Sequence, residues 1–134
     1  MRNPIDRRRI RSDEPDIAVD MQLSHIAHVL NLDALVLADD MGQAVSQIGD
    51  TEIGELLAAM VMWSSVTGEV DELTIEALQE RDPTIKRTHV TRVSVDIPGE
   101  ANRLELVALG RSIVTSIGLA HAAEGIRRIR TKRN

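Results

Sequence analysis

A β-hairpin predicted over residues 32–50 constrains the fold of this chain more than any other stretch. The apolar run 35–38 gives its first strand, and Val45 and Ile48 belong to the returning strand. The sequence Asp-Asp-Met-Gly between them suits a tight turn, because Gly42 can adopt a positive φ without steric cost. We interpret the two acids of this sequence as turn residues and not as ligands of a cation.

Helices are predicted on both sides of the hairpin, and strands return in the second half of the chain. The expected order is a helix beginning near 13–16 and stopping at Asn31, the hairpin, a helix over 52–63, a further helix or an extension of that helix over 69–80, strands over 86–97 and 103–109, and a helix over 118–129. The segment 112–117 stays open between a strand and the start of the last helix, although its β-branched residues favour a strand. This order predicts an α+β fold with a single antiparallel sheet of about five strands covered by helices.

The domain organisation follows from length and composition. The 134 residues can bury a core, and 43% of them are hydrophobic. We expect one domain over 13–130, with a disordered basic arm at 1–12 and a flexible basic tail at 131–134. No apolar run approaches the roughly 18–20 residues that span a bilayer, and no signal peptide is evident. Together with the absence of cysteine, this predicts a cytoplasmic protein.

Charge is sharply segregated along the chain. Residues 12–80 contain 15 Asp or Glu and no Lys or Arg, whereas both flanking segments are basic and the net charge is −5. One interpretation is that solvated faces simply carry charge. The other is an acidic surface that meets a basic partner, or the basic half of a second copy.

No pattern in the chain predicts catalysis, a cofactor or a metal site. The sequence has no Walker loop and no GxGxxG, GxSxG or HExxH motif. His25 and His28 are spaced to share a metal ion, but no third ligand is evident. One Trp without Phe or Tyr provides few rings for base stacking, so nucleic-acid binding is not expected. We therefore expect a binding protein and not an enzyme.

The helix predicted over 52–63 carries the candidate interface. It is apolar over much of its circumference, and such a helix often has a second surface to bury. Its alanines are either simple helix formers or part of a helix–helix interface between subunits, and we favour the interface. The candidate dimer or partner interface comprises Leu56, Ala59, Met60, Met62 and Trp63. In the helix over 69–80, Leu73 is expected to face inward.

With these elements in order, the chain resembles the Roadblock/dynein light chain family and its bacterial members. The resemblance rests on the VLADDMGQAV hairpin after an amphipathic helix, the helix over 52–63, a strand over 104–109 ending in glycine, and the alanine-rich LAHAAEGIRRI. It covers about residues 17–130. It implies a small fold that homodimerises by pairing its central helix and joining two sheets, with no catalysis and no cofactor. It also implies a scaffold or regulator whose candidate partner is a small Ras-like GTPase.

Two alternatives stay open at this point. The strand, acidic-glycine turn and strand unit is also typical of GAF and profilin-like domains, so a small-ligand sensor is one alternative. A purely structural self-association domain is the other. The segment 69–80 and the shortage of aromatic residues depart from the family pattern, and the segment looks like an insertion.

Overall fold

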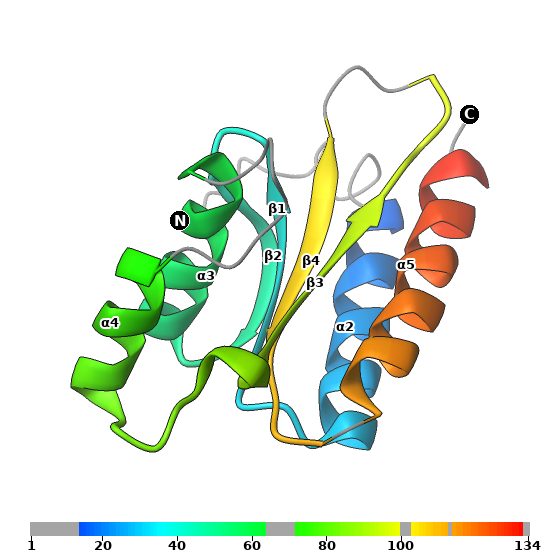
Figure 1. Cartoon of the computed structure of the whole chain (residues 1–134). Helices are drawn as coiled ribbons and strands as arrows, with labels where there is room; N and C mark the ends of the chain where they lie inside the picture. The colour runs from blue at the N-terminus through cyan, green and yellow to red at the C-terminus, as the bar shows by residue number, and fades with distance from the viewer. Residues whose placement is uncertain (1–13, 64–71, 100–102, 113, 133–134) are drawn as a thin grey trace, which may run out of the picture.

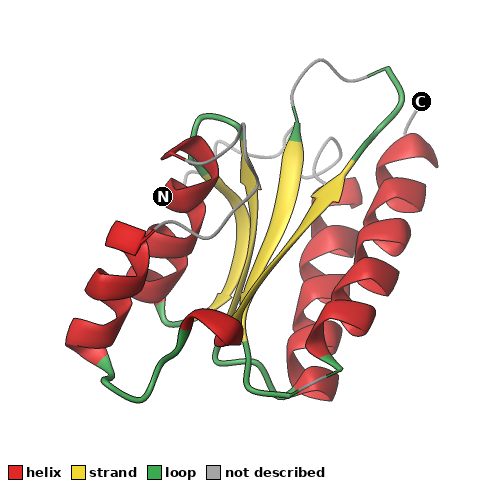
Figure 2. Cartoon of the chain, in the orientation of Figure 1, coloured by secondary structure: helices red, strands yellow, loops and turns green. Residues whose placement is uncertain are grey.

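The computed structural model describes residues 14–63, 72–99, 103–112 and 114–132. Its elements are α2 (Glu14–Leu30), β1 (Ala34–Asp39), β2 (Ala44–Gly49), α3 (Thr51–Trp63), α4 (Glu72–Arg81), a 3₁₀ turn η2 (Arg87–His89), β3 (Val90–Val95), β4 (Leu104–Leu109) and α5 (Thr115–Lys132). The strands form one antiparallel sheet in the order β2-β1-β4-β3. Helices α2 and α5 cover one face, and α3 and α4 lie on the other (Figures 1 and 2). The expected α+β architecture is confirmed.

The predicted hairpin is confirmed and its first strand lies inside the sheet. β1 pairs with β2 on one side and with β4 on the other. In the turn, the carboxylate of Asp39 accepts hydrogen bonds from the backbone N–H groups of Met41 and Gln43, both at 3.0 Å. Gly42 has a φ of 80°, which a residue with a side chain rarely adopts. Asp39 therefore acts as a turn residue, as predicted.

Apolar side chains fill two layers, one on each face of the sheet. Successive residues of a strand point to opposite faces, so the buried strands β1 and β4 contribute to both layers. The layer beneath α2 and α5 includes Val19, Leu23, Leu35, Leu37, Leu106, Leu119 and Ile126. The layer beneath α3 and α4 includes Val36, Leu57, Met60, Val61, Ile75, Leu78, Val107 and Leu109.

Glycines allow α2 and α5 to pack closely. A Cβ atom added at Gly118 would lie 2.6 Å from Leu30, and one added at Gly125 would lie 2.7 Å from Gln22. These two contacts also show that α2 and α5 run in opposite directions. The start of α2 therefore lies beside the end of α5.

The number of strands differs from the expectation, because the described residues contain four strands and not about five. The strand favoured for 112–117 is replaced by the start of α5 at Thr115. Ser112 accepts the hydrogen bonds that start this helix, although the β-branched residues after it favour a strand. Its hydroxyl accepts a hydrogen bond from the N–H of Val114 at 3.2 Å, and its carbonyl accepts one from Thr115 at 3.2 Å.

Several boundaries also differ from the expected ones. The strand expected over 86–97 is shorter, because η2 occupies its first part and β3 spans only Val90–Val95. Helix α4 covers most of the segment 69–80, and α5 extends to Lys132. The arm at 1–12, the first residues of 69–80 and the last two residues of the tail lie outside the described residues.

Candidate functional site

Helix α3, which carries the candidate interface, is anchored at its N-terminus. The carboxylate of Asp50 accepts a hydrogen bond from the N–H of Ile53 at 3.0 Å, so Asp50 caps the helix as its residue type predicts. Gly54 lets α3 approach β2, because a Cβ atom there would lie 2.9 Å from the side chain of Gln47. Gly54 therefore lies on the side of α3 that faces β2.

The structure distributes the five candidate interface residues between core and surface. Met60 is fully buried beneath α3. Leu56 and Ala59 are half-buried, and Met62 is 42% exposed. Trp63 is the last residue of α3, and its side chain lies outside the described part of the structure. Ala59 and Met62 are thus open to a second surface, while Met60 supports the helix from inside.

Helix α4 packs beside α3 and runs in the opposite direction. The guanidinium group of Arg81, at the end of α4, pairs with Asp50 at 3.2 Å and with Glu52, both at the start of α3. Ile75 and Leu78 of α4 are buried in the same core layer as α3. The two helices therefore form one continuous layer over this face of the sheet.

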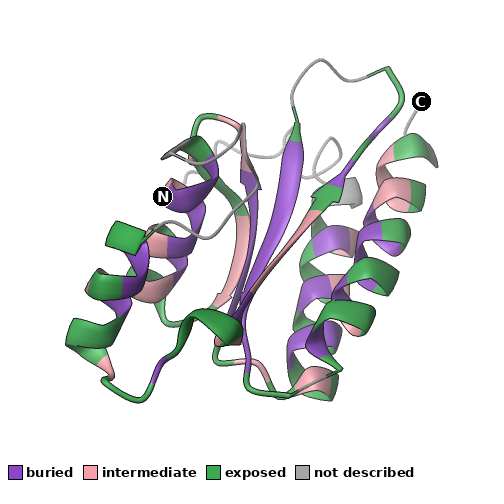
Figure 3. Ribbon diagram, viewed as in Figure 1, coloured by how far each residue is buried: buried purple, intermediate pink, exposed green. Residues whose placement is uncertain are grey.

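The solvent side of this helix pair is the candidate functional site, and we call it the α3–α4 face. It comprises Glu55, Ala59, Met62, Leu73, Glu76 and Glu80. Met62 and Leu73 are exposed apolar side chains, and Leu73 is 73% exposed. Figure 3 shows that α4 presents mostly exposed residues on its outer side. Within the described residues, the three glutamates form no ion pair.

Leu73 is the residue of this face that the sequence pattern misplaced. It was expected to face inward, but Thr74, Ile75 and Leu78 are the buried residues of α4. Apolar residues occur on both sides of this short helix, so the sequence pattern alone does not decide which side is buried. The spacing of Ile75 and Leu78 was the signal that favours the observed phase.

The segregated charges of the chain partly neutralise one another within the fold. Four ion pairs join a base of residues 81–134 to an acid of residues 12–80, namely Arg81 with both Asp50 and Glu52, Arg87 with Glu72, and Arg111 with Asp33. The acidic stretch therefore meets part of its basic counterpart in the same chain. The glutamates of the α3–α4 face are left without such a counterpart among the described residues.

Arg111 also ties the loop after α4 to the start of α5. It pairs with Asp82 at 3.1 Å and donates to the carbonyl of Thr84 at 3.5 Å. The hydroxyl and N–H of Thr84 donate to the carboxylate of Asp82, and these bonds lower the pKa of Asp82, with a further contribution from Arg111. This cluster holds α4 in place beside the sheet.

An ion pair is buried between β3 and β4, on the side of the sheet that carries α3 and α4. Two guanidinium nitrogens of Arg92 donate to the carboxylate of Glu105, at 2.8 and 2.9 Å. Both side chains are at most 5% exposed. The partly exposed side chain of Arg103 also donates to this carboxylate, at a distance of 3.2 Å. Sequence reasoning did not find this pair, because the cross-strand register that brings it together comes from the fold.

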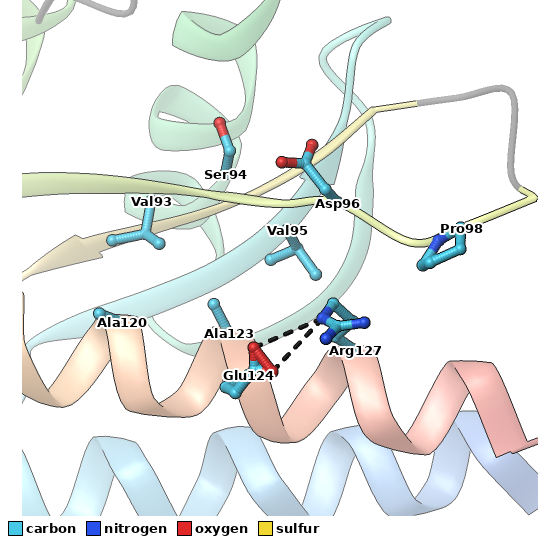
Figure 4. A pocket seen from close by; sticks show the side chains of 9 residues that line it. All are labelled: Val93, Ser94, Val95, Asp96, Pro98, Ala120, Ala123, Glu124 and Arg127. Atoms are coloured by element: carbon cyan, nitrogen blue, oxygen red, sulfur yellow. Dashed lines mark hydrogen bonds and ion pairs between the residues drawn. The ribbon is translucent and has the colours of Figure 1, made fainter.

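A groove of about 400 Å³ lies between β3 and α5. It is lined by Val93, Ser94, Val95, Asp96, Pro98, Ala120, Ala123, Glu124 and Arg127 (Figure 4). Glu124 and Arg127 pair with each other at 3.3 Å. The described residues contain no group of three or more potential metal ligands, and none of their helices is long and apolar enough to cross a membrane.

Comparison with solved structures identifies the fold. Myxococcus xanthus MglB is similar with a TM-score of 0.52 and 12% identity, over 85% of this chain and 88% of that chain. An MglB described as having a tetrameric arrangement is similar with a TM-score of 0.57 and 14% identity, over 90% of this chain and 93% of that chain. No family model and no curated protein matches the sequence. The chain therefore has a Roadblock-like fold, which confirms the fold that the resemblance implied.

Proposed function

We propose that this protein is a non-catalytic regulator or scaffold that forms homodimers and binds a protein partner through the α3–α4 face. The observation that carries the proposal is the composition of that face. Exposed Met62 and Leu73 lie on the same helix layer as three glutamates that form no ion pair within the described residues. Exposed apolar side chains rimmed by charge are typical of protein-binding surfaces.

In this proposal, the second copy contacts Leu56, Ala59, Met62 and Trp63, and Met60 holds these residues in place from the core. The Roadblock-like fold supports self-association, since one of the similar MglB structures is described as having a tetrameric arrangement. The half-buried Ala59 supports it as well, because a small residue lets two helices approach each other.

The proposed partner is a small Ras-like GTPase, as the family resemblance implies. The three glutamates of the α3–α4 face would meet basic residues of this partner. Complementary charge favours both the encounter of two proteins and their orientation. The protein itself supplies no catalytic group in this role. It orients residues of the GTPase, whose hydrolysis depends mainly on positioning and electrostatics. The proposed place of action is the cytoplasm.

Light scattering on the full chain at micromolar concentration tests the homodimer. The substitution Met62→Glu is expected to convert a dimer to a monomer, because it places a charge in an apolar interface. Met21→Glu is the matched control, since Met21 is 68% exposed on α2, on the other side of the sheet. A wild-type protein that is strictly monomeric would contradict the proposal, and so would equal masses for wild type and Met62→Glu.

A pull-down with the small GTPases of the source organism, loaded with GDP or a GTP analogue, tests the partner. We expect nucleotide-dependent binding that Glu76→Lys weakens, because the reversed charge repels a basic partner. Asp20→Lys makes the same charge change at an exposed position of α2, on the other side of the sheet, and should leave binding intact. If none of these GTPases binds in a nucleotide-dependent way, the regulator part of the proposal is wrong.

A further inference from the structure

The edge of the sheet at β3 is open, because β3 has no neighbour beyond β4 among the described strands. The N–H of Gly110 donates to the carbonyl of His89 at 2.9 Å, in the register that β3 and β4 continue. Backbone groups of successive residues in an antiparallel pair point alternately toward the partner strand and away from it. Those of Val93 and Val95 therefore face β4, and those of Ser94 face the open edge.

This edge borders the groove between β3 and α5. Figure 4 shows Val93 and Val95 pointing toward α5, where two alanines leave space, and Ser94 and Asp96 pointing away from it. Outward backbone groups beside a groove for alternate side chains are the features with which proteins bind extended peptides as an added strand. The edge and the groove together thus have the features that suit an added strand.

Charge and side-chain spacing indicate which strand fits. Residues 7–11 read Arg-Arg-Arg-Ile-Arg. Side chains of a strand alternate between its two sides, so Ile10 and Arg8 share one side and Arg9 lies on the other. With Ile10 above the valines and alanines of the groove, Arg8 comes to the rim that carries Glu124. Arg9 then lies on the side of Asp96, which forms no ion pair with the described residues.

The reach of the chain decides which copy supplies this strand. The four steps from Ile10 to Glu14 span at most about 14 Å. From the start of α2, beside the end of α5, the path to Ala123 crosses a helix about 10 Å wide and descends about 14 Å along it. The direct distance from the start of α2 to Ala123 is therefore about 17 Å. This exceeds the roughly 14 Å that the chain can span, so Ile10 of the same copy does not reach Ala123.

We propose that the β3 edge and its groove bind residues 7–11 of a second copy of this chain as an added strand. Hydrogen exchange of single backbone amides, measured by NMR on the full chain, tests this independently of the α3–α4 face. At two protein concentrations about fifty-fold apart, the Ser94 amide should exchange about tenfold more slowly at the higher one. The amides of Val93 and Val95 face β4 and report whether the sheet is intact.

Substitutions in the segment identify the strand that binds. Ile10→Asp should abolish the protection of Ser94 at high concentration, because it places a charge above the apolar groove. Ile5→Asp is the matched control, because it makes the same change just before residues 7–11, and it should retain the protection. Protection that does not depend on concentration overturns the proposal. Protection that survives Ile10→Asp also overturns it, and would show that another strand, such as β3 of a second copy, occupies the edge.

Discussion

Replacing Glu105 by Gln should lower the free energy of unfolding by about 3 kcal/mol, because it breaks a buried ion pair. The carboxylate accepts hydrogen bonds from Arg92 at 2.8 and 2.9 Å, and both side chains are at most 5% exposed. A glutamine keeps one acceptor oxygen but turns an N–H donor toward the guanidinium donors. Arg92 keeps further contacts, so the loss belongs at the lower end of the range of about 3–5 kcal/mol for such pairs.

Urea unfolding followed by circular dichroism measures this loss. With an m-value of about 2 kcal/mol per molar urea, the midpoint should fall by about 1.5 M. Arg103→Gln is the matched control, because Arg103 donates to the same carboxylate but is 48% exposed. Its cost should stay below about 1 kcal/mol. Equal midpoint shifts for Glu105→Gln and Arg103→Gln would refute the reasoning that burial gives the pair its effect.

Three further outcomes are expected. Met60→Asp should destabilise the fold by about 4 kcal/mol or more, since it buries an unpaired charge beneath α3; unchanged thermal stability would show that α3 is placed wrongly. Gly49→Ala should cost about 1–3 kcal/mol in urea unfolding, because φ is 100° there and the new Cβ would lie 2.6 Å from the carbonyl oxygen of Asp33; a neutral effect would contradict that geometry. The pKa of Asp82 is lowered below 3.8 in the fold, so its contribution to stability is present above that pH and is lost as pH falls through the folded value. The stability difference between wild type and Asp82→Asn should therefore be constant near neutral pH and shrink in acid, and a difference that does not change with pH would refute this.

The hairpin and helix α3 could be predicted from the sequence because their signals are local. Gly42 and Asp39 lie within one turn, and the capping bond from Asp50 reaches only to Ile53. A contact between near neighbours depends on few other parts of the chain, so its residue types indicate it directly. The exposed part of the candidate site on α3 was predictable for the same reason, since a helical period separates Met62 from the core.

The rest of the candidate site was not predictable in this way. Leu73 lies on the surface because α4 is rotated to bury Ile75 and Leu78, and Arg81 fixes that helix against the start of α3. The end of the segment 112–117 belongs to α5, because the hydrogen bonds to Ser112 outweigh the strand preference of β-branched residues. In both cases contacts with particular residues decide the structure against the local sequence pattern.

By itself, the sequence determined the elements with a local signal, the α+β class and the lack of any recognised catalytic motif. Only the tertiary structure decided that β1 pairs with β4, that Arg92 and Glu105 meet inside the fold, and that β3 leaves an edge beside a groove. The physical reason is that these features depend on contacts between segments far apart in the chain. The energies of such contacts come from register and burial, which exist only once the whole sheet has formed.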